Sequence, residues 1–448
     1  MGWAMCHVRP RRESGKSGSV NVKSLDVLMP AEGMGLIGDL IAKRLPLHRL
    51  WLEPNPETWL AEWGPRLRAL AMTGGHGPID DAYMRRLPNL EVIASFGVGY
   101  DHIDARAAAR RGIIVTNTPG VLDDEVADTA LGLMIMAVRQ LSQAERYLRA
   151  GRWLNGAFPL TASLRGRIVG IVGLGRIGKA IAARVSAFGL EVVYHGRNPQ
   201  AEVAHRYFPS LVDMAKACDI LIVVAPGGPA TRHLINAEVL EALGPDGVFV
   251  NIARGSLVDE KALIEALRTG KILAAGLDVF ENEPNVPEEL IALDNVVLLP
   301  HVGSASTKTR RAMADCVVAN IFAWADGKPP LTPVPETPWR GQWGDGGPSQ
   351  GQAREAPASG EQAKAMTDRQ SLIGGILDVM RSSWDLPADC NDGELFAYAE
   401  ALVDRIEAGD SRQALCAYLA GVQVDNLDMP KSDAYQEIVD RSVALVKD

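Results

Sequence analysis

Three residues far apart in the chain have side chains that could do acid–base chemistry on an anionic ligand. Arg254, Glu283 and His301 each follow an apolar run that predicts a β-strand. An imidazole titrates near neutral pH and can donate a proton, a carboxylate can orient it, and a guanidinium can bind an anion. Taken singly, they could also be a packed histidine, a turn residue before Pro284 and half of an ion pair. Whether they form one catalytic site therefore depends on the elements that bring them together.

A glycine-rich turn in the middle of the chain is the first of these elements. The apolar run Ile168–Val172 predicts a buried strand, and Lys179–Phe188 has the pattern of an amphipathic helix. Between them stand Gly173, Gly175 and Gly178, in the spacing G-x-G-x-x-G. Such glycines let the backbone approach a pyrophosphate, to which the helix N-terminus offers free N–H groups. The unit predicts a dinucleotide site, and the alternative is a structural turn in another α/β protein.

The strand after the glycine turn indicates the form of the dinucleotide. NAD enzymes of this fold usually end that strand with an Asp or Glu, which binds the ribose 2′-OH. Here the strand ends in Gly196, Arg197 and Asn198, and Glu191 stands at its beginning. A guanidinium in place of a carboxylate suits a 2′-phosphate, so we expect NADP(H), with NAD(H) as the second candidate. The other explanation is that Arg197 is merely solvated.

The residues predicted to bind the cofactor belong to the glycine turn and to the strand ends that follow it. For Asp278 the sequence leaves two roles open, contact with the nicotinamide or orientation of its own loop. Asp128 and Thr129 either face the cofactor or pack between helices. The predicted cofactor-binding set is Gly173, Leu174, Gly175, Arg176, Ile177, Gly178, Arg197, Asn198, Ala225, Pro226, Ile252, Ala253, Asp278 and Gly303.

Short apolar runs alternate with helical patterns through most of the chain, which predicts an α/β fold with two Rossmann-like, doubly wound parallel-sheet domains. The first sheet is expected from strands near residues 26–30, 47–52, 67–72, 90–96 and 113–119. The second is expected from strands at 168–172, 191–195, 220–225, 247–252, 274–279 and 296–299. A long helical region at 123–148 should bridge the sheets, and a helix at 306–325 should return to the first domain.

The composition changes after Leu331. Residues 332–361 hold five Pro and six Gly, and from residue 361 onward 17 acidic residues stand against 8 basic ones. Helical periodicity returns at 368–383, 392–408, 410–423 and 432–446, which predicts a small all-helical domain. The predicted organisation is a disordered extension (1–22), a substrate-binding domain (23–120 with 302–331), a dinucleotide-binding domain (121–301), a flexible linker (332–362) and an acidic helical domain (363–448).

Composition excludes several classes of function. The net charge is −9 and no Lys/Arg cluster stands out, so no nucleic-acid binding is expected. No run of about 18 apolar residues occurs, so no membrane span is expected. The five Cys residues form no CxxC pair, so we expect neither a disulfide framework nor a metal site. This cysteine usage favours a cytoplasmic location. The basic residues among the first 20 fit a targeting peptide or a plain extension.

Several motifs make the chain from about Val27 to Val334 resemble the D-isomer-specific 2-hydroxyacid dehydrogenases. They are Ser95-Phe-Gly-Val-Gly-Tyr-Asp101, Val115-Thr-Asn-Thr-Pro119, Val126-Ala-Asp-Thr-Ala130, the glycine turn and the segments around Arg254, Glu283 and His301. Within that family the chain is most similar to the NADPH-dependent hydroxyphenylpyruvate and hydroxypyruvate (glyoxylate) reductases.

The resemblance implies a homodimer that reduces a small 2-keto acid to the D-2-hydroxy acid. Arg254, Glu283 and His301 would be catalytic, with His301 as proton donor. Arg254, His301 and the backbone of Val98 and Gly99 would bind the substrate. Glyoxylate, hydroxypyruvate and hydroxyphenylpyruvate all stay candidates. The loop at 153–158 would line the partner's pocket, as that region does in relatives.

Two other functions stay open at this stage. Some relatives act as nucleotide-sensing corepressors, and the C-terminal helical domain would then bind a protein partner. A phosphite-type dehydrogenase would use Arg254 and His301 on a different anion. The missing ribose carboxylate argues against a sensor of NAD(H).

Overall fold

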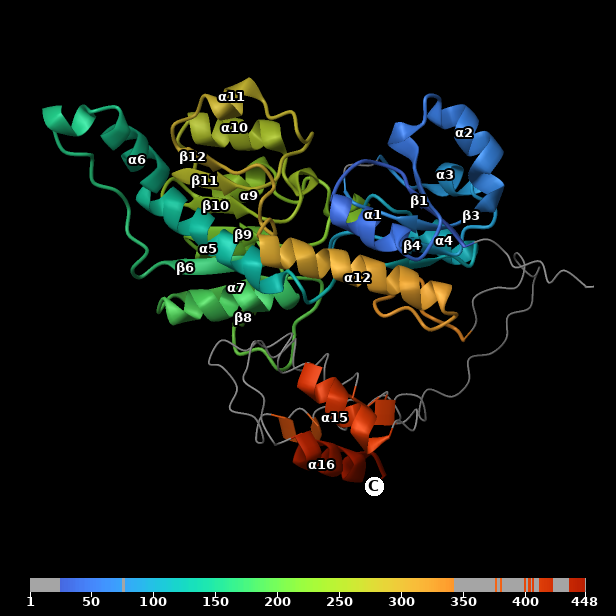
Figure 1. The fold of residues 1–448 in the computed structure, drawn as a ribbon. Helices are drawn as coiled ribbons and strands as arrows, with labels where there is room; N and C mark the ends of the chain where they lie inside the picture. Colours follow the sequence, from blue (N-terminus) through green and yellow to red (C-terminus); the bar gives the residue numbers. More distant parts are fainter. Residues whose placement is uncertain are drawn as a thin grey trace, which may run out of the picture. The chain divides into compact units, whose positions relative to one another are not determined.

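The computed structural model describes residues 25–74 and 77–341 and, further on, 375–376, 379–380, 399, 402–403, 405–406, 411–421 and 435–447. The chain divides into two compact units, Met1–Pro348 and Ser349–Asp448. The first unit contains both α/β domains (Figure 1). The extension expected at 1–22 lies outside the described residues.

The first domain is built on a five-stranded parallel sheet of order β2-β1-β3-β4-β5. Its strands are β1 (Asp26–Met29), β2 (Leu47–Arg49), β3 (Leu67–Ala71), β4 (Val92–Ala94) and β5 (Ile114–Thr116). Helices α1 (Gly35–Ala42), α2 (Pro56–Trp63), α3 (Asp81–Arg85) and α4 (Ala105–Arg110) connect them, with 3-10 turns η1 (Leu50–Leu52) and η2 (Gly64–Arg66). The predicted alternation is confirmed, but β2 is shorter than expected because Leu50–Leu52 closes into the 3-10 turn.

The second domain holds a seven-stranded parallel sheet of order β12-β11-β10-β9-β6-β7-β8. Its strands are β6 (Ile168–Val172), β7 (Glu191–His195), β8 (Arg206–Phe208), β9 (Ile220–Val223), β10 (Val248–Asn251), β11 (Ala274–Leu277) and β12 (Val296–Leu298). Six of them were predicted, and the edge strand β8 was missed. Its three residues are too few to show a period-two pattern, and their pairing with β7 depends on the fold.

Helices cover both faces of this sheet, as a doubly wound fold requires. Alternate residues of β9 point to opposite sides, with Leu221 and Val223 in one core cluster and Ile220 and Ile222 in the other. The first cluster includes residues of α8 (Leu211–Ala217), α9 (Ala237–Leu243) and α10 (Glu260–Arg268). The second includes residues of α7 (Arg176–Ala187) and α5 (Asp123–Arg139). The shorter elements are α11 (Glu288–Ile291), η3 (Arg152–Asn155), η4 (Pro229–Thr231) and η5 (Gly255–Leu257).

Two long helical segments connect the domains. The region predicted as one helix is split, because Gln140 has left-handed backbone (φ 48°) between α5 and α6 (Leu141–Arg149). Helix α12 (Thr307–Ala325) runs from the second domain to the first, as expected (Figure 1). Its Met313 packs with the second domain's core, whereas Val317 and Ile321 pack with the first domain's core.

The predicted linker cannot begin at Thr332, because residues 332–337 pack against the first domain. The Val334 N–H donates to the Val115 carbonyl at 2.9 Å, and the Thr337 hydroxyl accepts from the Val115 N–H at 2.9 Å. Buried Asn320 of α12 accepts from the N–H groups of Leu331 and Thr332. Composition suggested a linker, but specific hydrogen bonds and one buried valine order this stretch. Of the rest of the predicted linker, residues 338–341 are described, and residues 342–362 lie outside the described residues.

The second unit has a small helical core in its described part. Helices α15 (Arg412–Gly421) and α16 (Tyr435–Lys447) confirm two of the four predicted helices. Leu415, Leu419 and Ile438 are buried together with Ile376 and Leu402. The other two predicted helices fall mainly outside the described residues. Across the described stretches of both units, no helix combines the length and apolar character needed to cross a membrane.

Candidate active site

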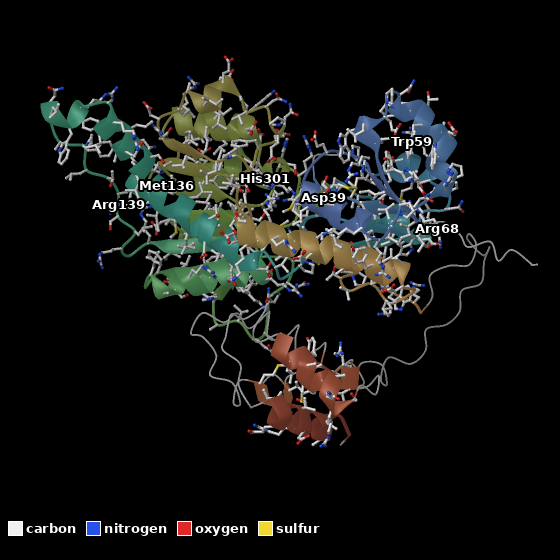
Figure 2. All side chains as sticks on the ribbon, in the orientation of Figure 1. Asp39, Trp59, Arg68, Met136, Arg139 and His301 are labelled. Atoms are coloured by element: carbon white, nitrogen blue, oxygen red, sulfur yellow. The ribbon has the colours of Figure 1, made fainter. Side chains whose placement is uncertain are left out.

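The predicted catalytic residues lie at the carboxyl ends of neighbouring strands. Arg254 follows β10, Glu283 lies in the loop after β11, and His301 follows β12. Because these strands are adjacent and parallel, their ends meet at one edge of the sheet. Figure 2 shows His301 on the side of the second domain that faces the first.

His301 and Glu283 form a hydrogen-bonded pair. The His301 Nδ1 lies 2.7 Å from the Glu283 Oε2, and the Phe280 N–H donates to the other carboxylate oxygen at 3.0 Å. Burial by itself would raise the pKa of Glu283. The hydrogen bonds from His301 and Phe280, with the charges of His301 and Arg254, outweigh it and hold that pKa below its usual value. Glu283 is therefore ionised at neutral pH, and the imidazole Nε2 is left for a ligand.

Asp278 holds the backbone that carries His301. Its buried carboxylate accepts from the N–H groups of Val302 and Gly303 at 2.7 and 2.8 Å, and its carbonyl accepts from the His301 N–H at 2.9 Å. Burial raises the pKa of Asp278 in spite of these hydrogen bonds. Of the two roles left open by the sequence, orientation of the loop is the one these contacts support.

Arg254 reaches from the second domain to the first. Its Nε donates to the Asp101 Oδ1 at 3.0 Å and its Nη1 to the Ala253 carbonyl at 2.8 Å. The Nη2 lies beside Gly99, where a Cβ atom would approach it within 1.9 Å. In the described chain no acceptor pairs with the N–H groups of Val98 and Gly99, and Asn117 anchors this loop by donating to the Val98 carbonyl at 2.9 Å. The four predicted substrate-binding residues thus come from facing domains.

The glycine turn has the geometry of a dinucleotide site. Gly173 has φ +96°, and a Cβ there would lie 2.8 Å from the Ala225 backbone. A Cβ at Gly178 would lie 2.2 Å from the Gly173 carbonyl oxygen, whereas one at Gly175 would meet nothing within 4 Å. Helix α7 begins at Arg176, three residues before the predicted start, so its free first-turn N–H groups lie at the turn. These features fit a pyrophosphate.

The loop after β7 lies against this turn. Gln200 donates from its side chain to the Leu174 carbonyl at 2.7 Å, and its N–H donates to the Tyr194 hydroxyl at 2.8 Å. Arg197 and Asn198 are exposed in the same loop, and Glu191 is exposed at the far end of β7. The positive side chain thus lies at the end of β7 that adjoins the glycine turn, and the Glu191 carboxylate lies at the other end.

The structure gives different contacts to Asp128 and Thr129 of α5, whose roles the sequence left open. Asp128 pairs with Arg184 of α7, Oδ1 to Nε at 2.5 Å, which is a helix-packing contact. The Thr129 hydroxyl lies 3.3 Å from the Gly303 carbonyl, beside the loop that follows His301. Asp101, Asn117 and Gln200 were not predicted. Only Asp101 and Asn117 lay in motifs that could have drawn attention to them.

Comparison with known proteins agrees with this geometry. Residues 131–303 match the family model for the NAD binding domain of D-isomer specific 2-hydroxyacid dehydrogenases. The chain is 46% identical over 313 residues to glyoxylate/hydroxypyruvate reductase A of Arabidopsis thaliana and 44% identical over 313 residues to hydroxyphenylpyruvate reductase of Plectranthus scutellarioides. Each alignment covers 70% of this chain and 100% of the relative. The chain belongs to the D-isomer-specific 2-hydroxyacid dehydrogenase family.

A solved structure of another family member extends the comparison. The NADPH-dependent glyoxylate/hydroxypyruvate reductase of Sinorhizobium meliloti, in complex with NADP and malonate, is 49% identical and superposes with a TM-score of 0.66. The match covers 70% of this chain and 98% of that one. The predicted family resemblance and the two-domain α/β fold are confirmed.

Two glycine substitutions should separate folding from dinucleotide binding. Gly178→Ala should lower the free energy of unfolding by about 1–3 kcal/mol, because its Cβ would collide with the Gly173 carbonyl oxygen. Gly175→Ala should leave stability near that of the wild type, since its Cβ has open space, but weaken dinucleotide binding about tenfold or more. Urea unfolding and fluorescence titration with NADPH and NADH measure both effects. Wild-type binding of both nucleotides by Gly175→Ala would contradict this placement of the pyrophosphate.

Proposed function

We propose that this protein reduces a small 2-keto acid to the D-2-hydroxy acid with NADPH. One arrangement carries the proposal: the Glu283–His301 pair and Arg254 end adjacent strands opposite the unpaired N–H groups of Val98 and Gly99. Such a reduction requires a proton donor near the keto oxygen and groups that bind the carboxylate of the same small molecule. The named activities of the relatives support it.

Each of these residues has a separate role in the proposed reaction. Arg254 and the N–H groups of Val98 and Gly99 bind the substrate carboxylate and thereby hold the keto carbon in one orientation. Bound NADPH supplies the hydride that this carbon accepts. The His301 Nε2 donates a proton to the keto oxygen, and ionised Glu283, hydrogen-bonded to Nδ1, holds the ring in that orientation.

The cofactor would lie along the carboxyl ends of the second sheet. The pyrophosphate is assigned to the glycine turn and the start of α7, and the nicotinamide to the ends of β9, β10 and β11. The assigned residues are those predicted from the sequence: Gly173, Leu174, Gly175, Arg176, Ile177, Gly178, Arg197, Asn198, Ala225, Pro226, Ile252, Ala253, Asp278 and Gly303. The close approach of Gly173 to the Ala225 backbone supports the placement of the pyrophosphate at this turn, whereas the contacts of Asp278 favour its role in orienting the His301 loop.

The proposed substrate class follows from the named activities of the relatives and from the groups assigned to the substrate carboxylate, which are Arg254 and the N–H groups of Val98 and Gly99. Glyoxylate, hydroxypyruvate and 4-hydroxyphenylpyruvate are the candidates that the relatives' names support. The comparisons favour neither the corepressor-like sensor nor the phosphite-type dehydrogenase. NADPH oxidation with each keto acid tests the proposal, and no turnover with any of them would overturn it.

The catalytic pair makes a prediction about pH. His301→Ala should lower kcat about 100-fold or more because the proton donor is lost. Glu283→Gln should lower kcat about tenfold at every pH from about 5 to 9, because the pKa of Glu283 is held below its usual value and the wild-type carboxylate therefore stays ionised and hydrogen-bonded to the His301 Nδ1. Rates measured from about pH 5 to 9 test this. His205→Ala, before the amino end of β8, is the control. A wild-type kcat in Glu283→Gln across this pH range would remove Glu283 from its role.

The proposed preference for NADPH depends on Arg197. Arg197→Ala should raise the KM for NADPH about tenfold and change the KM for NADH little, because only NADPH carries a 2′-phosphate. Arg165→Ala, an exposed arginine before the amino end of β6, is the matched control. Equal changes in the KM for NADPH and for NADH in Arg197→Ala, or a preference of the wild-type protein for NADH, would contradict the assignment.

We also propose a homodimer that forms through α6 and the segment after it. Figure 1 shows α6 extending from the second domain, and none of its residues is buried. Trp153, Leu154 and Leu160 are 67%, 92% and 102% exposed, an apolar surface that a second copy of the chain would cover. The cytoplasmic location, a protein partner for the C-terminal helices and the predicted domain roles stay predictions.

Substitution of this surface tests the dimer. The double variant Leu154→Asp/Leu160→Asp should sediment as a monomer, because charges would face the partner's apolar surface. Ile291→Asp, on the exposed face of α11, is the control and should leave the mass unchanged. A monomeric wild-type protein, or a double variant that stays dimeric, would refute this interface.

A further inference from the structure

The arrangement around Arg254 raises the question of what holds its guanidinium in place. This side chain is long and about one-third exposed, so without partners it would sample many rotamers. Two of its nitrogens have acceptors, Nε at Asp101 and Nη1 at the Ala253 carbonyl. Because a guanidinium is planar, these two hydrogen bonds fix its plane. The third nitrogen, Nη2, is then directed to the Gly99 backbone.

Asp101 is well placed to fix that orientation because it belongs to the opposite domain. It lies in a turn in which the Ile103 N–H donates to the Tyr100 carbonyl at 2.9 Å. The Tyr100 hydroxyl donates to Glu336 at 2.9 Å, within the segment that packs on the first domain. A single carboxylate thus connects the first domain to the arginine of the second.

A loop of the second domain approaches the pair from another side. A Cβ at Gly227, after β9, would lie 3.1 Å from the Asp101 carboxylate and 3.1 Å from the Arg254 Cγ. A Cβ at Gly99 would lie 3.1 Å from the Asp101 Oδ1. Gly99 and Gly227 thus both lie against the ion pair, and a larger side chain at either position would displace it.

We propose that Asp101 is a positioning residue, which orients Arg254 across the domain interface so that Nη2 meets the substrate carboxylate. Asp101 itself does not contact the substrate in this assignment. The Asp101 oxygen that accepts from the Arg254 Nε is what orients the guanidinium. An amide oxygen at the same position should therefore orient it as well. This inference rests on the proposed function, since it concerns the residue that would bind the keto acid.

Two substitutions at position 101 test the inference in the full-length protein. Asp101→Ala should lower kcat/KM for the best keto acid about 10- to 100-fold, because Arg254 loses its orientation. Asp101→Asn should stay within about threefold of the wild type, since its carbonyl oxygen can accept from Nε. Asp81→Ala is the matched control: it removes another Asp Oδ1–Arg Nε pair, with Arg111 at 2.7 Å, of similar exposure in the same domain.

A binding measurement keeps the test independent of turnover. Oxamate, a carboxylate that is not reduced, would be titrated into the protein–NADPH complex. Asp101→Ala should weaken oxamate binding about tenfold and leave the dissociation constant for NADPH unchanged, whereas Asp101→Asn and Asp81→Ala should bind both like the wild type. Thermal unfolding checks that all variants fold.

The outcomes separate this inference from the proposed function. Wild-type kcat/KM and oxamate binding in Asp101→Ala would overturn the positioning role while leaving the reductase in place. Asp101→Asn as impaired as Asp101→Ala would also overturn it, because the charge and not the accepting oxygen would then matter. A wild-type protein that reduces no keto acid would refute the proposed function, and oxamate binding would still test Asp101.

Discussion

The parallel direction of seven strands is the constraint on which the site depends. Parallel strands bring all their carboxyl ends to one edge of the sheet, so loops that are distant in sequence meet there. Arg254, the Glu283 loop and His301 follow β10, β11 and β12, while the glycine turn follows β6. The cores on both faces of the sheet hold these strands in register, and thereby hold the loops.

The site also depends on the way in which two domains meet. Helices α5 and α12 connect the domains along the chain, and Glu125 of α5 accepts from Ser306 and Thr309 at the start of α12. The first domain contributes the Val98–Gly99 backbone and Asp101, and the second contributes the charged side chains. An active site assembled from two domains can exclude water when the domains close, which strengthens its electrostatic interactions.

Much of the fold could be predicted from the sequence because its signals are local. Buried parallel strands are continuous apolar runs, and crossover helices have their own period, so both sheets and the bridging helices were predicted. The strand that was missed is short, and helix α2 was also not predicted. Strand β8 has three residues, and residues 332–337 are ordered by hydrogen bonds to Val115 and Asn320 that no local pattern reveals.

The sequence by itself determined which residue types were present at each strand end: a glycine turn, an arginine in place of the ribose carboxylate, and an Arg, a Glu and a His in three separate loops. It could not decide which of these side chains touch. Only the tertiary structure paired His301 with Glu283, tied Asp278 to the loop backbone and joined Arg254 to Asp101. The physical reason is that these contacts join segments 18 to 153 residues apart, so their geometry follows from sheet order and domain packing.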